Sequence, residues 1–206
     1  MRIFNFKVSD FEKEYDAPEG LFQSEHAIVD NEIANNLAPD WDYTKADIIC
    51  TGILQNAEMT IFLREEEDTA QFKEALKLNL NKDVTYHAFN RNMEFGNFVG
   101  FLDKELLVKE IKPFKAKGWN KEAFFEQLMR DEVIPKVKIY DPFLGDGGQC
   151  IVSWKIYLQS NDNEELMKVV MHNVNCLLKE AVILKHKDHF EKNWRIDNKG
   201  FMLERK

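Results

Sequence analysis

The spacing of apolar residues changes partway along this chain, and that change limits the folds open to it. Three apolar runs rich in β-branched residues come early, at His26–Val29, Asp47–Leu54 and Met59–Leu63. Such runs are typical of strands buried in a sheet. The short segment Gln55–Glu58 between the second and third runs predicts a hairpin turn. The first part of the chain therefore predicts three antiparallel strands joined in order.

Beyond residue 65 the apolar residues recur at helical spacing. The positions three or four residues apart predict a helix over 66–80; they are Phe72, Ala75, Leu76 and Leu80. The same reasoning predicts strands at Val84–Phe89 and Glu105–Ile111, and helices at Asn92–Leu102, Lys121–Met129, Ile151–Leu158 and Glu164–Lys187. We therefore expect an α/β fold. Its mixed sheet has antiparallel first strands and parallel additions, and helices flank it.

One domain accounts for the whole chain, 1–206, because 44% of its 206 residues are hydrophobic and can form one core. We expect that core to span about residues 25–187. Residues 1–24 show only a turn at Pro18–Gly20, and loops are expected at 35–45 and 136–149. Residues 188–206 read as a polar, basic tail. Four of its residues are candidates for contact with single-stranded nucleic acid or with a protein partner: Phe190, Trp194, Arg195 and Phe201.

The overall charge and the apolar pattern exclude several classes of protein. The net charge of −8 argues against broad, non-specific binding to duplex nucleic acid. No apolar run approaches the ~18 residues of a membrane-spanning helix, and the first residues lack the apolar core of a secretory signal. Three cysteines suggest neither a disulfide framework nor a zinc pattern. A cytoplasmic protein without a membrane partner is expected.

The pair Asp30–Glu32 follows the apolar run Ala27–Val29 directly. Alternate residues of a strand project from the same face, so the two carboxylates would lie side by side. Like charges that close repel one another unless a positive group lies between them. Mg²⁺ or Mn²⁺ is the usual partner, since hard cations prefer carboxylate oxygens. The plainer interpretation is a strand end that runs into solvent.

Two later segments carry further candidates. Asn90 and Glu94 lie where a predicted strand passes into a helix; Asn90 is a helix cap in the plainer interpretation, and Glu94 a first-turn acid or a ligand of the same ion as Asp30. His172, Cys176 and Glu180 are spaced four residues apart on the last long helix, so they share one face. The loop 141–148 is acidic and rich in glycine, without the Lys-Ser/Thr of a phosphate-binding loop.

The order of these features resembles a known family. A D-x-E strand end comes first, followed by a hairpin, a helix, a strand that leads through Asn90 to Glu94, and a last helix with His172-Asn173. In this order the chain resembles the DEDD-type 3′–5′ exonucleases of the ribonuclease H-like superfamily. It is most similar to the predicted exonuclease branch often called YprB-like. The resemblance covers about residues 27–184 and implies a ribonuclease H-like sheet.

The resemblance also implies roles for residues of this chain. Asp30 and Glu32 match the first two acids of the pattern, and Glu94 stands at the third; all three are expected to bind metal and act in catalysis. His172 matches the residue that assists the attacking water. Asn90 and Asn173 are expected to contact substrate.

The fourth acid of the pattern falls at Cys176, or at Leu177 under another spacing, and neither residue is acidic. Glu180, one turn further along, is the expected replacement as a metal ligand. An intact site implies two Mg²⁺ or Mn²⁺ ions and cleavage of phosphodiester bonds at single-stranded DNA or RNA ends.

Two alternatives stay open at this point. The departure at Cys176 fits an exonuclease fold that has lost activity and binds nucleic acid or a protein partner. An unrelated α/β domain with an accidental D-x-E is the plainest possibility.

Overall fold

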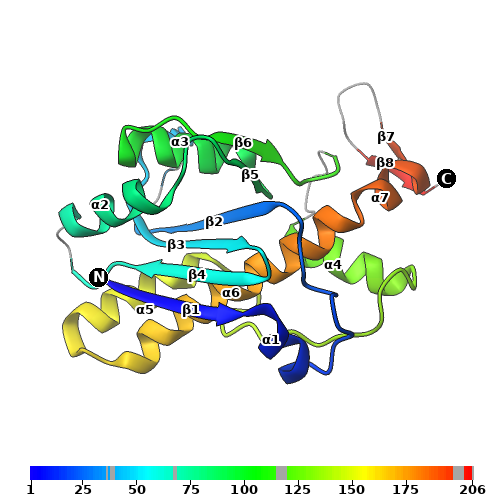
Figure 1. Cartoon of the computed structure of the whole chain (residues 1–206), viewed down its shortest axis with the longest axis horizontal. Coiled ribbons are helices and arrows are strands. Elements are labelled where there is room, and N and C mark those ends of the chain that lie inside the picture. The colour runs from blue at the N-terminus through cyan, green and yellow to red at the C-terminus, as the bar shows by residue number, and fades with distance from the viewer. Residues whose placement is uncertain (36, 38–39, 67–68, 115–119, 197–201, 206) are drawn as a thin grey trace.

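The computed structural model describes residues 1–35, 37, 40–66, 69–114, 120–196 and 202–205, and its centre is a six-stranded sheet in the order β1-β4-β3-β2-β5-β6 (Figure 1). The strands are β1 (Arg2–Lys7), β2 (Ala27–Ile33), β3 (Ile48–Gln55), β4 (Glu58–Leu63), β5 (Thr85–Ala88) and β6 (Leu107–Glu110). The strand that carries the D-x-E pair, β2, is therefore an inner strand, with β3 on one side and β5 on the other.

The pairing directions divide the sheet at β2. Strands β1, β4, β3 and β2 pair antiparallel to their neighbours, while β2, β5 and β6 pair in parallel. This arrangement confirms the predicted mixed sheet, in which an antiparallel hairpin precedes parallel additions. The hairpin β3–β4 turns at Asn56 and Ala57, which both have positive φ.

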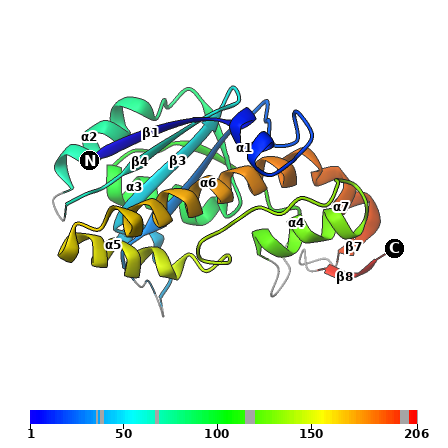
Figure 2. The ribbon, with the colours of Figure 1, turned by 90° about the horizontal axis from the view of Figure 1, so that it is seen from below.

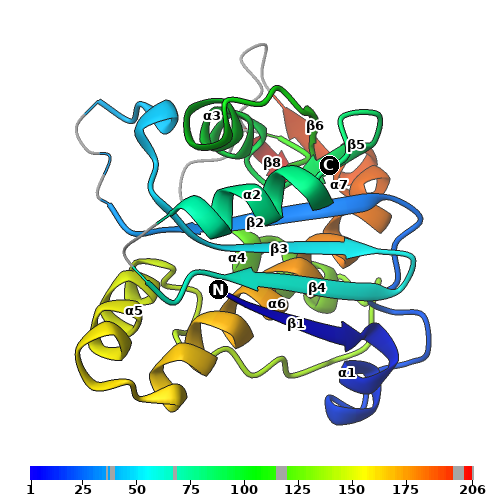
Figure 3. The same cartoon turned by 60° about the vertical axis from the view of Figure 1, so that its left-hand side comes forward.

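Helices cover both faces of the sheet. On one face lie α4 (Lys121–Arg130), α5 (Gly148–Ser160) and the long α6 (Asn163–Lys185); on the other lie α2 (Ala70–Asn79) and α3 (Arg91–Leu102) (Figures 2 and 3). Each face has its own hydrophobic core. No helix among the described residues is long and apolar enough to cross a membrane.

The alternation of β2 divides its side chains between these two cores. Ile28 belongs to the core under α6, whereas Ala27 and Val29 belong to the core under α2 and α3. Since side chains alternate along a strand, Asp30 and Glu32 follow Ile28 towards α6. The D-x-E pair therefore faces the last long helix, from inside the molecule.

The expected core was too narrow at both ends. Residues 1–24 form an edge strand, β1, and a short helix, α1 (Val8–Glu14), with Val8 and Phe11 buried. At the other end, α7 (Lys187–Asn193) leads into a hairpin of β7 (Trp194–Ile196) and β8 (Met202–Arg205). Phe190 is fully buried against Phe124.

The expected stacking role of the tail is therefore wrong for Phe190 and for Trp194, which is only 8% exposed. Both aromatic side chains belong to the core. The charged residues around them in the sequence do not prevent burial of the rings. The side chain of Arg195, and Phe201 altogether, lie outside the described part of the chain.

Two glycines allow close packing between neighbouring elements, one between β3 and α6 and the other between α3 and the segment after residue 42. A Cβ on Gly52, the β3 partner of Asp30, would lie 2.0 Å from Asn173 Oδ1 and 2.7 Å from Leu177 Cδ1. A Cβ on Gly100 of α3 would lie 1.7 Å from the carbonyl oxygen of Thr44, in the 3₁₀ turn η1 (Tyr43–Lys45). The missing side chains let α6 approach Asp30 and let η1 pack on α3.

Replacement of Gly52 by alanine is expected to lower the free energy of unfolding by about 1–3 kcal/mol, because the added methyl group overpacks the contact between β3 and α6. Urea denaturation measures the change. Gly148→Ala is the matched control, since its Cβ would meet only Asp146 Oδ1, at 3.0 Å, on the surface. Equal effects of the two substitutions would contradict the close approach of α6.

Candidate active site

A pocket of about 660 Å³ opens at the end of β2, on the side of α6. That volume lies within the range of ligand clefts, roughly 300–1,000 Å³. Side chains from five parts of the chain line it, including Asp30, Glu32, Trp41, Lys121, His172 and Cys176. The D-x-E pair of β2 and the His-x₃-Cys face of α6 thus meet in one cleft.

Asp30 and Glu32 lie side by side and are nearly buried, with 3% and 7% of their surfaces exposed. Asn173 of α6 joins them. Its Nδ2 donates to the Asp30 carbonyl oxygen at 3.1 Å, to Asp30 Oδ2 at 3.0 Å and to Glu32 Oε1 at 3.5 Å. Asn173 is therefore a positioning residue for both carboxylates.

A lysine that the sequence did not single out sits between two of the acids. The Nζ atom of Lys121 lies 2.5 Å from Asp30 Oδ1 and 2.9 Å from Glu180 Oε1. Lys121 is the first residue of α4, and the Asn120 side chain caps that helix by accepting the Ala123 N–H at 3.0 Å. The cap signal is visible in the sequence, but no local pattern tells where the ammonium group points.

Glu180 and Glu94 are fully buried beside this ion pair. Glu180 Oε2 accepts the backbone N–H of Phe89 at 3.3 Å. Glu94 accepts a hydrogen bond from Asn31, the middle residue of D-x-E, which faces away from Asp30 and is itself held by Thr51 at 2.6 Å. The structure thus brings Glu94 and Glu180 to the same end of β2 as Asp30, with neither among the pocket-lining residues.

Burial dominates the electrostatics of these acids. It raises the pKa of Glu32 to about 7, with a further rise from the charge of Asp30, and it raises the pKa values of Glu94 and Glu180 well above their ordinary range. Burial opposes the charge on Lys121, but its carboxylate neighbours outweigh this and raise the lysine pKa. Lys121 is therefore the fixed positive charge of the site.

His172 is held by a carboxylate from the acidic loop. Its Nδ1 lies 2.8 Å from Asp141 Oδ1, while its Nε2 lies 3.7 Å from both Glu32 Oε1 and Cys176 Sγ. Asp141 also accepts the backbone N–H groups of Phe143 and Gly145. Burial alone would lower the pKa of His172, but the hydrogen bond with Asp141 outweighs it and raises this pKa to about 11. The pKa of Asp141 falls to about 2 because His172 outweighs its burial.

Two groups of side chains in the described chain are close enough to share a metal ion. Asp30, Glu32 and Cys176 form one group, and Glu32, Cys150 and His172 form the other; within each, the ligand atoms lie within 4.8 Å of one another. The first group opens to the pocket and fits a single cation. Asn173 adds no ligand to this group, because its Nδ2 faces the two carboxylates and its buried Oδ1 is directed at Gly52 of β3.

Glu180, the expected replacement for the missing acid, is not free to share an ion with Asp30. The Lys121 ammonium already pairs with both carboxylates. Among the described residues, the group that opens to the pocket is therefore one possible cation site, and the Lys121 ammonium lies beside it.

Of the two asparagines expected to contact substrate, only Asn90 lines the pocket. Asn90 caps α3 by accepting the Met93 N–H at 3.4 Å and also lines the pocket. Asn173 is buried and engaged with Asp30 and Glu32. The pocket rim instead offers Trp41, which is 61% exposed.

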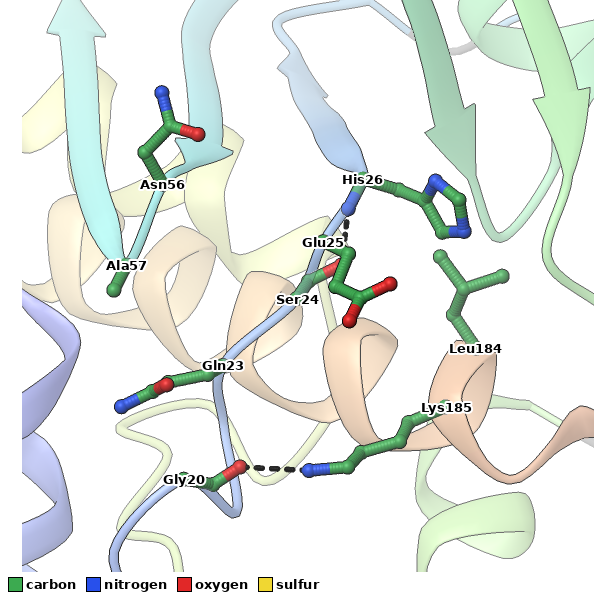
Figure 4. A pocket seen from close by; sticks show the side chains of 9 residues that line it. All are labelled: Gly20, Gln23, Ser24, Glu25, His26, Asn56, Ala57, Leu184 and Lys185. Carbon is green, nitrogen blue, oxygen red and sulfur yellow. Dashed lines mark hydrogen bonds between the residues drawn. The ribbon is translucent and has the colours of Figure 1, made fainter.

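A second pocket, of about 620 Å³, lies at the opposite end of β2 (Figure 4). Lys185 donates to the Gly20 carbonyl oxygen at 2.8 Å there, and Glu25 and His26 line it. Neither of the two groups of potential metal ligands in the described chain lies in this pocket. The chemistry therefore favours the pocket at Asp30.

No protein-family model matches the chain, and no curated protein matches it by sequence.

Replacement of Lys121 by methionine is expected to lower the free energy of unfolding by about 3 kcal/mol at neutral pH, because Asp30 and Glu180 lose their counter-charge. The loss should shrink as the pH falls to mildly acidic values, because burial raises the pKa of Glu180 well above its ordinary range and a protonated Glu180 needs no counter-charge. Urea denaturation at neutral and at mildly acidic pH measures it, with the exposed Lys82→Met as control. A loss that is independent of pH would contradict the ion-pair assignment.

The imidazole of His172 is expected to titrate near pH 11 in the metal-free protein, as measured by NMR. Because this folded-state pKa is above the ordinary 6.5, the stabilisation is complete below about pH 6.5 and is lost as the pH rises towards 11. The decline is at most about 1.4 kcal/mol per pH unit. Asp141→Asn should lower the pKa and flatten this dependence; an unchanged titration in that variant would overturn the role of Asp141.

Proposed function

We propose that this protein is a metal-dependent hydrolase that removes nucleotides from the 3′ ends of single-stranded nucleic acid. The observation that carries the proposal is the convergence of Asp30, Glu32, His172 and Cys176 at one pocket. Glu94 and Glu180 lie behind it. The order of elements that suggested an exonuclease therefore also brings its key side chains together.

The strand order supports the same proposal. Strands β4-β3-β2-β5-β6 place the strand with the D-x-E pair at the centre, its hairpin on one side and the parallel strands on the other. Antiparallel first strands followed by parallel additions are what the resemblance to a ribonuclease H-like sheet implies, and β1 is added at the edge. The last long helix packs on the face to which Asp30 and Glu32 point, as the exonuclease pattern requires.

In this proposal each side chain has a distinct task. Asp30 and Glu32 hold the cation, and Asn173 fixes their orientation. A divalent cation bound there supplies an activated water and stabilises the leaving oxygen. Lys121 contributes a positive charge beside Asp30, where charge builds up on a phosphate in the transition state.

His172 is the proposed proton acceptor. Asp141 holds its Nδ1, so Nε2 faces Glu32 and Cys176 at the pocket. Only neutral imidazole accepts a proton. A cation bound at Glu32 would offset one of the negative charges that favour the protonated form of His172, and so would lower its pKa towards that of a proton acceptor.

One observation favours a binding module as the second candidate function. Lys121 occupies the space between Asp30 and Glu180 that a second ion needs in a two-ion mechanism. If one cation is insufficient for cleavage, the same pocket, with Trp41 exposed at its rim, binds single strands without cutting them.

The test uses 5′-labelled single-stranded DNA and RNA oligonucleotides with Mn²⁺, Co²⁺ or Mg²⁺. The expected result is a ladder of products that shorten from the 3′ end. Asp30→Asn should lower the rate by about 100-fold or more, because it removes a ligand of the cation. Glu25→Gln is the matched control, since Glu25 lies in the pocket at the far end of β2.

Cleavage that survives Asp30→Asn would refute the site. Absence of cleavage with every cation, together with single-strand binding that Trp41→Ala weakens, would refute the hydrolase and select the binding module.

A further inference from the structure

We propose that Cys176 replaces the missing acid as the third ligand of the cation at Asp30 and Glu32, so that this site selects a thiophilic ion of the zinc and cobalt class over Mg²⁺. The inference names the metal of the proposed hydrolase and rests on the same pocket. It concerns a residue whose thiol departs from the all-oxygen pattern of the resemblance.

The geometry gives Cys176 the reach of a ligand. Its Sγ, one oxygen of Asp30 and one oxygen of Glu32 all lie within 4.8 Å of one another. A tetrahedral ion with bonds of ~2.0–2.3 Å spans ligand atoms at such separations after small side-chain adjustments. The three residues come from β2 and α6, elements that Asn173 ties together.

The three ligands also face an accessible space. Asp30, Glu32 and Cys176 all line the pocket, so an ion held by them keeps an open position for water or substrate. Three protein ligands with one open position are the usual composition of a catalytic zinc site.

The chemistry of sulfur decides the kind of ion. Thiolate is a soft ligand that Zn²⁺ and Co²⁺ accept, whereas Mg²⁺ takes oxygen ligands almost exclusively. Binding releases the thiol proton to solvent, since the thiolate is the form that ligates. The resulting negative charge takes the place of the carboxylate that the exonuclease pattern has at this position.

The second group, Glu32 with Cys150 and His172, is the rival location. Cys150 is fully buried and is not among the residues that line the pocket. Asp141 holds Nδ1 of His172, and Nε2 lies 3.7 Å from both Glu32 Oε1 and Cys176 Sγ, so the imidazole borders both groups. The accessible group with Cys176 is therefore favoured, and the two locations make opposite predictions for the two cysteines.

The test is a Co²⁺ titration of the reduced, metal-free protein, followed by absorption. A thiolate-to-cobalt charge-transfer band is expected in the near ultraviolet. Cys176→Ala should abolish the band, while Cys150→Ala and Cys50→Ala should retain it. Cys50, on β3, is a third buried free cysteine outside both groups, and so controls for loss of a buried thiol.

A gain-of-function variant tests the choice of ion. Cys176→Asp restores three carboxylates and should shift the ratio of Zn²⁺ to Mg²⁺ affinity, measured by calorimetry, by at least about tenfold towards Mg²⁺. This variant keeps a potential ligand at position 176. A circular dichroism spectrum that matches the parent protein shows that the variant is folded, so a changed ion preference then reports on the ligand.

Three outcomes would overturn the inference: no charge-transfer band in the parent protein, a band lost in Cys150→Ala but kept in Cys176→Ala, or an unchanged ion preference in Cys176→Asp. The proposed function is judged separately. A band that depends on Cys176 in a protein without cleavage supports the metal site and refutes the hydrolase. Cleavage with Mg²⁺ by a protein that shows no band supports the hydrolase and refutes the role of Cys176 as a ligand.

Discussion

The ion pair of Lys121 with Asp30 and Glu180 is the interaction on which the packing around the pocket depends. Four acids, from β2, α3 and α6, meet there with little access to water. Buried carboxylates without a counter-charge are strongly unfavourable, so a fixed ammonium group is what allows these three elements to pack together. The helix α4 consequently does more than cover the sheet, because its first residue carries that charge to the end of β2.

A second set of charged side chains lies around Asp141, which is also a buried carboxylate paired with basic groups. One oxygen of Asp141 contacts His172 Nδ1, and Lys179 Nζ lies 3.6 Å from the other oxygen. Lys179 also pairs with Glu122 of α4. The acidic loop is thus tied to α6 and α4 at once. Glu32 lies between the two sets and has the pKa, about 7, of a group that neither set fully compensates.

Much of the sheet could be predicted because its signals are local. The inner strands are continuous apolar runs, and the hairpin and the helices follow from short-range spacing. The strand β1 was missed although Phe4 and Phe6 alternate with polar neighbours, because an edge strand that is only half buried carries a weak version of the pattern. Phe190 was assigned to a solvent-exposed tail for the opposite reason: charged neighbours hid a single buried ring.

The candidate site was predictable only where one element carries it. Alternation on β2 and the helical repeat of α6 placed Asp30 with Glu32 and His172 with Cys176. Lys121 is 91 positions from Asp30, and Asn31 reaches Glu94 across 63 positions. No local spacing encodes such contacts, since they depend on how closely whole elements pack. The sequence likewise predicted no metal site at the cysteines, because they are far apart along the chain. The fold brings Cys176 and Cys150 close to Glu32.

The close packing of η1 on α3, through Gly100, links the rim of the pocket to its buried end. Helix α3 carries Glu94 in its first turn, beneath β2, and further along, at Gly100, it contacts the turn that follows Trp41. The rim of the pocket and the carboxylate cluster therefore both contact α3. Local unfolding of α3 would dismantle both in a single cooperative step, so the pocket and the carboxylate cluster should be lost together on heating rather than in succession.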